Sequence, residues 1–295
     1  MNNAPHTFFT LLQFSEQSSG VIRLIESIRA FGGDFRTAPI WVFDATPQQF
    51  GIGRLKRAEV EVIPLSIPES VQRNYFAGKV LAAAQAESTA TPGESTLIWM
   101  SSDSLIFQPP LGFDLDGKYD IALRPVHIRN IGLRVDEPLN EFWKTIYAAV
   151  GLDDVDVQID SFVDGQRLRA YFNSHSYAIH PGLGLLREWY AIFEKLVCDE
   201  IFQQGVCKEP RYQIFLHQAV FSALIIKMIE TPRIRLLPPE YSYPYHLHSQ
   251  IPAAQRAQRF NDLVCIAYED QSLNPTDLTN IAVEEPLKSW LEGYH

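Results

Sequence analysis

Residues 97–107 read Leu-Ile-Trp-Met-Ser-Ser-Asp-Ser-Leu-Ile-Phe, and this stretch decides the fold that the sequence predicts. Its first four residues are apolar, its next four are polar, and its last three are apolar again. A short apolar run beside turn-forming residues is typical of a buried strand in a parallel sheet. Because ligands bind at the carboxyl ends of such strands, the carboxylate of Asp103 is a candidate for chemistry. Ser and Asp also favour ordinary turns, which is the competing interpretation.

The composition is that of a globular protein with a substantial core. Of its 295 residues, 46% are hydrophobic and 20% are charged, which fits one large α/β domain. The net charge of −10 argues against broad binding to nucleic acid or to an anionic membrane. No apolar stretch is long enough to span a bilayer, and the N-terminus lacks the basic start of a secretory signal.

The cysteines favour a reducing compartment. Cys198, Cys207 and Cys265 are odd in number and form no Cys-x-x-Cys pair. Neither a disulfide framework nor a thiolate metal cluster is therefore expected. Together with the charge and the missing signal, this predicts a cytoplasmic protein.

The chain begins with strands and a helix in alternation. Apolar runs at Thr7–Phe14, at Pro39–Phe43 and at residues 60–63 predict three strands. Between the first two, apolar residues at helical spacing predict a helix over residues 21–31, which Gly32 ends. This order indicates right-handed strand–helix–strand units and a parallel sheet.

The later elements continue an α/β pattern. Helices are expected over residues 74–87, 138–150, 186–197, 213–228 and 286–291, and strands over residues 119–123 and 263–267. Residues 171–181 combine a polar centre with aromatic and apolar flanks, and no element is assigned to them. We interpret residues 126–170 as an insertion or lid and residues 271–295 as a C-terminal extension of a single domain.

One lysine stands out on the helix that precedes residue 97. Lys79 lies on the same side of that helix as Phe76 and Ala83, which belong to its buried stripe. Because the helix leads into the strand that ends at Asp103, Lys79 can reach the same place. The competing interpretation is a lysine whose ammonium group extends to solvent.

Five short segments follow one another in an order with a known counterpart. They are the helix with Lys79, Ile98–Ile106, Tyr171–Ser174, His217–Leu224 and Leu237–Tyr241. This order resembles the GT-A nucleotide-sugar glycosyltransferases, especially the retaining family that includes glycogenin and bacterial lipopolysaccharide galactosyltransferases. The resemblance implies a single GT-A-like domain, in which helices flank a mostly parallel central sheet.

The resemblance also implies an activity and its residues. The protein is expected to move a sugar, as a hexosyltransferase, from a nucleotide-sugar donor to a carbohydrate or lipid-linked sugar acceptor. His217 and Gln218 match the family's Asp-Gln helix start and are the implied catalytic residues. Asn173 and Ser174 match its Tyr-Phe-Asn-x-Gly segment and are expected at the substrate. A core histidine and a turn at a strand end are the competing interpretations.

The donor side is expected to include Phe14, Ser15, Lys79, Ser101 and Asp103. Phe14 and Ser15 are placed near the nucleotide base by their position at the end of the first strand. A departing nucleoside diphosphate gains negative charge, which Mn²⁺ or Mg²⁺ and a lysine stabilise. In the family, an Asp-x-Asp motif holds that cation.

The sequence departs from the family pattern at three positions. Ser101 stands at the first aspartate of the motif, His217 stands where an acidic residue is common, and Ala267 stands where the family has a metal-binding histidine. The implied metal ligands are then Asp103 with His246 and His248. One carboxylate holds Mn²⁺ or Mg²⁺ weakly until a diphosphate adds its oxygens.

Three other functions compete with that of an active glycosyltransferase. The degenerate motif favours a catalytically impaired relative that acts as a nucleotide- or sugar-binding or scaffold protein. A sugar nucleotidylyltransferase is disfavoured because residues 15–19 contain no glycine for a phosphate loop. A dinucleotide-binding oxidoreductase is disfavoured because no Gly-x-Gly-x-x-Gly follows Phe14.

Overall fold

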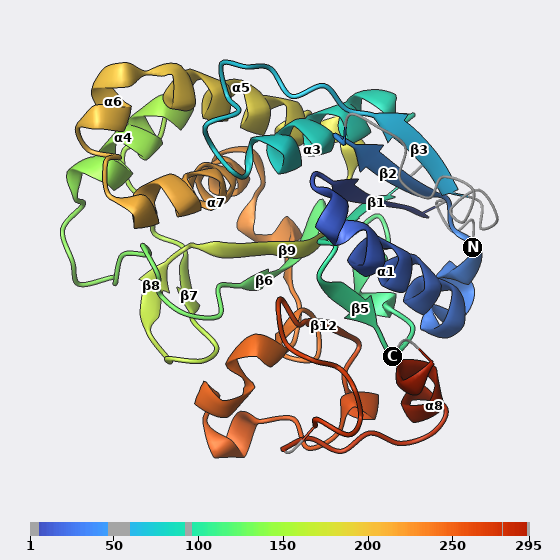
Figure 1. Cartoon of the computed structure of the whole chain (residues 1–295). Coiled ribbons are helices and arrows are strands. Elements are labelled where there is room, and N and C mark those ends of the chain that lie inside the picture. The colour runs from blue at the N-terminus through green and yellow to red at the C-terminus, as the bar shows by residue number, and fades with distance from the viewer. Residues whose placement is uncertain (1–5, 47–59, 92–95, 279, 294–295) are drawn as a thin grey trace.

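A seven-stranded sheet forms the centre of the protein (Figure 1). The computed structural model describes residues 6–46, 60–91, 96–278 and 280–293. In spatial order, the strands are β10 (Ile234–Leu236), β6 (Ile121–Pro125), β9 (Phe172–Ile179), β4 (Thr96–Met100), β1 (His6–Leu12), β2 (Ile40–Asp44) and β3 (Val60–Pro64). Strands β4, β1, β2 and β3 are mutually parallel, and β10 is parallel to β6. The predicted mostly parallel central sheet is confirmed.

Strand β9 lies in the segment, residues 171–181, to which the sequence analysis assigned no element. It runs antiparallel between β4 and β6, and pairs with both. Its side chains are buried along almost its whole length, including those of Asn173, Ser174 and Ser176. Polar residues in a buried strand break the apolar pattern by which strands are recognised, so the pattern did not reveal it.

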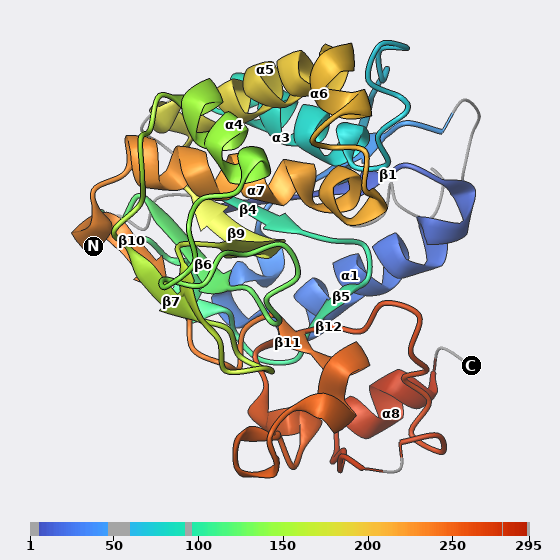
Figure 2. The same cartoon turned by 90° about the vertical axis from the view of Figure 1, so that its left-hand side faces the viewer.

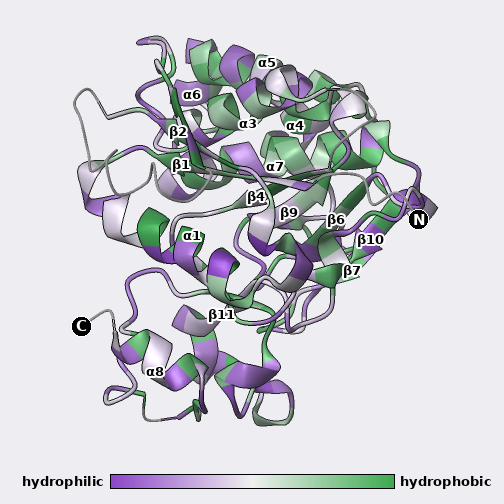
Figure 3. Ribbon diagram, turned by 90° about the vertical axis from the view of Figure 1, so that its right-hand side faces the viewer, coloured by the Kyte–Doolittle hydropathy of each residue, from purple (hydrophilic) through white to green (hydrophobic). Residues whose placement is uncertain are grey.

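Helices cover both faces of the sheet (Figures 1 and 2). On one face lie α3 (Ala77–Thr89), α4 (Glu141–Val150), α5 (Leu185–Cys198), α6 (Glu200–Gln204) and α7 (Pro210–Met228), and on the other lies α1 (Ser18–Phe31). In Figure 3, α1 alternates between hydrophobic and hydrophilic turns, as expected of a helix with one buried face. Helix α7 is buried through its middle because it packs against α4, α5 and β9.

A second, small sheet lies beside the carboxyl end of β4. Strand β5 (Ser104–Ile106) pairs with β12 (Cys265–Ala267), which pairs with β11 (Tyr243–Pro244). The chain thus leaves the central sheet after Met100 and enters another sheet at Ser104, with Ser101, Ser102 and Asp103 between the two. This sheet and α8 (Leu287–Glu292) contribute to a third apolar core.

The sequence analysis set two segments apart from the rest of the domain, as an insertion or lid and as a C-terminal extension. Residues 126–170 contain α4 and a hairpin of β7 (Gln158–Asp160) and β8 (Arg167–Arg169). In the C-terminal segment, Leu287 and Leu291 are buried and the ring of Trp290 packs on Phe31, with 5.4 Å between the ring centroids. Among the described helices, none is long and apolar enough to cross a membrane.

Candidate functional site

A cavity of about 720 Å³ opens at the carboxyl ends of β1 and β4. Its walls come from segments that are far apart in the sequence. They include Gln13 after β1, Tyr75 and Lys79 at α3, Ser101 to Asp103 after β4, Ser174 and His175 of β9, His217 and Gln218 of α7, and Glu269 after β12. Strand ends of an α/β sheet are where ligand sites are expected, so the cavity is our candidate functional site.

The polar turn, residues 101–104, is fixed by its backbone. Ser104 N–H donates to the carbonyl of Ser101 at 3.0 Å, and Tyr268 N–H donates to the carbonyl of Asp103 at 2.9 Å. The buried Asp103 Oδ1 accepts no hydrogen bond from the described residues. The turn therefore holds a carboxylate with an unused acceptor at the cavity.

Helix α1 approaches this turn closely at Gly20. A Cβ at that position would stand 2.5 Å from the carbonyl oxygen of Ser102, which is much shorter than any real contact. Any residue larger than glycine would push the turn or the helix aside. Gly20 thus helps to set the position of Asp103.

Lys79 is buried and faces the cavity. Its ammonium donates to the carbonyl oxygen of Ser174 at 2.6 Å and to Ser174 Oγ at 2.8 Å. It also lies 5.5 Å from the ring centre of Trp99. Burial lowers the pKa of Lys79 to about 7, although the charge of Asp103 opposes this shift. Near neutral pH, this group can carry or lose its charge.

His217 continues the polar chain that begins at Lys79. Its Nδ1 lies 2.9 Å from the carbonyl oxygen of Ile214, which fixes the proton on Nδ1. Its Nε2 lies 3.3 Å from Ser174 Oγ, and its ring stacks on Phe76 with 3.9 Å between centroids. Burial, with the charge of Lys79 nearby, lowers the pKa of His217 well below its ordinary value. His217 is therefore neutral at physiological pH.

Three potential metal ligands meet at the edge of the cavity. Asp103, His175 and Glu269 each offer one ligand atom, and these atoms lie within 4.8 Å of one another. His246 Nε2 stands 3.2 Å from Glu269 Oε1, and His175 Nε2 stands 3.6 Å from it. The residues present thus fit a divalent cation.

Most of the predicted site residues come together. Lys79, Ser101, Asp103, Ser174, His217 and Gln218 all line the cavity. Asn173 lies behind it, where its Oδ1 accepts from the backbone N–H of His175 at 2.7 Å. His246 reaches the cavity edge through its contact with Glu269.

Three predicted residues lie elsewhere. His248 is buried with both ring nitrogens engaged, by Tyr243 Oη at 2.8 Å and by the Asn280 carbonyl at 3.2 Å, so it offers a metal no lone pair. Strand β1 ends at Leu12, before Phe14 and Ser15, and neither residue lines the cavity. The ring of Phe14 instead stacks on Tyr75, which does line it, at 5.5 Å.

Among the candidate metal ligands, His175 and Glu269 are the ones that the sequence interpretation missed. His175 belongs to the segment similar to Tyr-Phe-Asn-x-Gly, at the position of the glycine. Glu269 follows Ala267 by two residues. The sequence did contain a sign of both residues. Where Ser101 and Ala267 replace two metal ligands of the family, a histidine and a glutamate nearby are candidates to replace those ligands.

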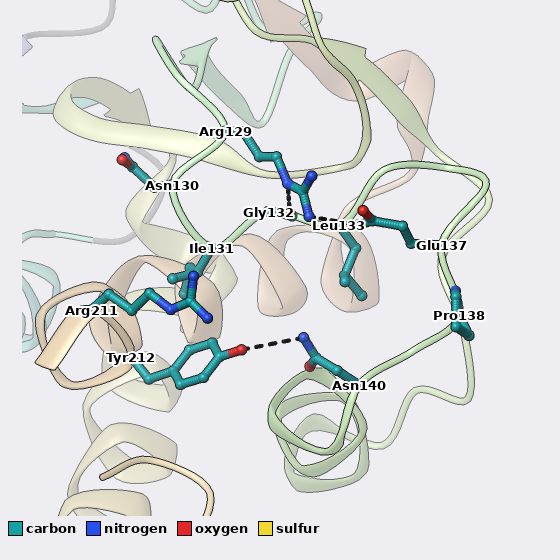
Figure 4. A pocket seen from close by; sticks show the side chains of 10 residues that line it. All are labelled: Arg129, Asn130, Ile131, Gly132, Leu133, Glu137, Pro138, Asn140, Arg211 and Tyr212. Carbon is teal, nitrogen blue, oxygen red and sulfur yellow. Dashed lines mark hydrogen bonds and ion pairs between the residues drawn. The ribbon is translucent and has the colours of Figure 1, made fainter. Parts of the chain in front are cut away.

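A second cavity, of about 290 Å³, lies at the start of α7 (Figure 4). Its two arginines are already engaged. Arg129 pairs with Glu137 at 2.7 Å, and Arg211 pairs with Glu209 at 2.9 Å. Asn140 donates to Tyr212 across the same cavity. Because both arginines are already paired with nearby carboxylates, we assign the site to the larger cavity.

Solved structures share this fold. The galactosyltransferase LgtC, in complex with donor and acceptor sugar analogs, matches with a TM-score of 0.53 and 12% identity, over 98% of this chain and 93% of its own. An active-site mutant of LgtC matches with a TM-score of 0.52 and 12% identity, over 97% and 95%. No protein-family model and no curated protein matches the sequence. The predicted GT-A-like glycosyltransferase fold is confirmed.

Proposed function

We propose that this chain, folded as a GT-A-like glycosyltransferase, transfers a sugar from a nucleotide-sugar donor that binds in the large cavity. The observation that carries the proposal is the buried ammonium of Lys79, held by Ser174 at the cavity wall near Asp103. A buried cation at the end of a parallel sheet suits the diphosphate of such a donor.

Each part of the cavity has a proposed role. Lys79 stabilises the charge that develops on the departing diphosphate. The exposed ring of Tyr75, backed by Phe14, offers a flat surface for the nucleobase. Gln218 contacts the transferred sugar, and neutral His217 holds Ser174 and, through it, Lys79 in place. The acceptor is proposed to be a carbohydrate or lipid-linked sugar.

Titration calorimetry with a panel of nucleotide sugars tests the donor site. We expect binding of at least one nucleotide sugar, and we expect Lys79→Met to weaken it about tenfold or more through loss of a charge-assisted contact. Lys144→Met is the matched control because Lys144 is an exposed lysine that pairs with Glu141. Absence of binding across the panel would remove the proposal, and equal losses in both variants would argue against the role of Lys79.

A second candidate function is a binding protein without catalysis. Ser101 and Ala267 favour it, because they leave the family's metal position with a single carboxylate. The two functions differ in turnover. A transferase releases nucleoside diphosphate when acceptor sugars are added, whereas a binding protein retains the intact nucleotide sugar. Chromatography of the nucleotide after incubation with acceptor mixtures separates them.

A further inference from the structure

The ligand atoms of Asp103, His175 and Glu269 come together because of strand register. The backbone N–H of Ser101 donates to the carbonyl of His175 at 2.9 Å, so β9 places His175 opposite the start of the polar turn. Ala267 of β12 pairs with Ser104, so the chain after β12 returns to the turn and brings Glu269 to Asp103. The central sheet and the small sheet together therefore place the three candidate ligands close to one another.

The tautomer of His175 is set by its neighbour. Its Nδ1 lies 3.2 Å from Asn173 Oδ1, which can only accept a hydrogen bond, so Nδ1 carries the proton. The other nitrogen, Nε2, then presents a lone pair toward Glu269 Oε1 at 3.6 Å. Metal-binding histidines are held in this way, with the second nitrogen donating to a carbonyl oxygen.

The cluster therefore consists of acceptors that face one another. Asp103 Oδ1 is buried and has no partner among the described residues. His175 Nε2 and the Glu269 carboxylate add a lone pair and a negative charge within 4.8 Å. Such groups repel one another unless a cation or a proton lies between them. Ligands around a tetrahedral zinc or similar ion stand about 3.4 Å apart, so small movements would complete the shell.

We propose that Asp103, His175 and Glu269 bind one divalent transition-metal ion, and that Mn²⁺, Co²⁺ and Zn²⁺ are preferred over Mg²⁺. Imidazole nitrogen suits Co²⁺ and Zn²⁺, the two carboxylates also suit Mn²⁺, and Mg²⁺ prefers a shell of oxygen ligands in near-ideal octahedral geometry. His175 and Glu269 take over from the two ligands that Ser101 and Ala267 no longer provide. When bound, the ion supplies positive charge for a diphosphate, so the role of the site rests on the proposed function.

Two further histidines flank the cluster. His246 Nε2 contacts Glu269 Oε1 at 3.2 Å, which makes His246 a positioning residue for that carboxylate. The ring of His127 stacks beside His175, with 6.2 Å between centroids, and both of its nitrogens lack partners among the described residues. Burial and neighbouring positive groups lower the pKa of His127, so it adds no competing charge.

The test is metal binding by the full chain without any nucleotide. After chelation and dialysis, Co²⁺, Zn²⁺, Mn²⁺ and Mg²⁺ are titrated by calorimetry at pH 7.5, and the visible absorption of bound Co²⁺ reports its coordination. We expect one ion to bind per chain, with Mg²⁺ binding most weakly, and the spectrum of bound Co²⁺ to show nitrogen ligation. The affinity for Co²⁺ should fall at least about tenfold in Glu269→Gln and in His175→Ala, and about tenfold in His246→Asn.

Matched controls are Glu284→Gln and His180→Asn, which lie outside the cavity. Circular dichroism verifies folding, and Glu269→Gln keeps the shape of a half-exposed side chain. No transition-metal binding, or binding that Glu269→Gln and His175→Ala leave unchanged, would overturn the proposal and leave a shared proton as the cation of the cluster. Because nucleotide is absent, this failure is separate from a failure to bind nucleotide sugars.

Discussion

Lys79 shows how burial gives one residue a pH-dependent role. Its pKa of about 7 means that it loses its charge as pH rises through neutrality, whereas a bound diphosphate favours the charged form. We therefore expect nucleotide-sugar affinity to fall roughly tenfold between pH 6 and pH 9, by linkage between proton and ligand binding. A nucleotide sugar is the right ligand because its pyrophosphate keeps its charge over this range.

The pH dependence of Lys79→Arg provides the control. Arginine keeps its charge across the range, so its affinity should change little with pH even if the longer side chain binds less well overall. Calorimetry at several pH values measures both proteins. If wild type and Lys79→Arg follow the same curve, then another group accounts for the dependence and the assignment to Lys79 is wrong.

Restoring the lost aspartate tests the role of the polar turn. Ser101 stands two residues before Asp103 and lines the cavity, so Ser101→Asp adds a second carboxylate near the cluster. We expect Mn²⁺ affinity to rise about tenfold or more, because hard cations prefer charged oxygens. Ser102→Asp is the neighbouring control. An unchanged Mn²⁺ affinity in Ser101→Asp would contradict the alignment of this turn with the Asp-x-Asp motif.

At the residue level, the sequence analysis predicted several residues that line the cavity, but not all of its candidate metal ligands. Lys79 was predictable because it lies on the buried side of a recognisable helix, Asp103 because it follows a recognisable strand, and Gln218 because its segment resembles the family's Asp-Gln helix start. Glu269 was not predictable, because its position depends on the antiparallel pairing of β12 with β5. In that pairing, Ile266 lies opposite Leu105, which is 161 residues earlier in the chain. Long-range register is invisible to local patterns.

Helices α3 and α5 are joined by an unusual cap. Helix α5 follows Gly184, which has no side chain to accept its first N–H groups. The carboxylate of Glu87, from α3, accepts instead from Leu186 at 3.2 Å and from Arg187 at 2.9 Å, and its side chain is fully buried. Burial raises the pKa of Glu87, while these hydrogen bonds oppose the shift.

Removing this cap should destabilise the protein. Glu87→Ala leaves two N–H groups without their acceptor, so we expect the free energy of unfolding to fall by about 2–3 kcal/mol. Glu87→Gln keeps one acceptor oxygen and should lose less. Urea unfolding followed by circular dichroism measures both, with the exposed Glu69→Ala as the control. A loss in Glu87→Ala no larger than in Glu69→Ala would show that the cap adds nothing.

At the element level, the sequence predicted helices better than strand partners. The helices at α1, α4, α5 and α7 follow from apolar residues at helical spacing. Strand β9 was missed because its polar side chains serve the cavity, as Ser174 does in holding Lys79. Strand β9 thus departs from the apolar pattern because it carries site residues. A buried strand favours apolar side chains, whereas the site requires polar ones.

The three apolar cores argue for one cooperative unit. Two of them cover opposite faces of the central sheet, and the third includes Leu105 of β5, which follows β4 after the polar turn. Leu273, Leu287 and Leu291, from the described part of the C-terminal segment, belong to this third core. A boundary between separately stable parts would have to cut through the polar turn that carries Asp103.

Calorimetric unfolding tests this unity together with the site. We expect a single transition, because β5 joins two of the cores: Leu105 belongs to the third core and Ile106 to the core that α1 covers. A nucleotide sugar at 100 times its dissociation constant should add about 2.7 kcal/mol and raise the whole transition by roughly 5 °C. The cavity draws walls from β1, α3, β9, α7 and the chain after β12, so the ligand should stabilise all of them at once. Two transitions, of which the ligand moves only one, would show instead that the small sheet and α8 fold apart from the donor site.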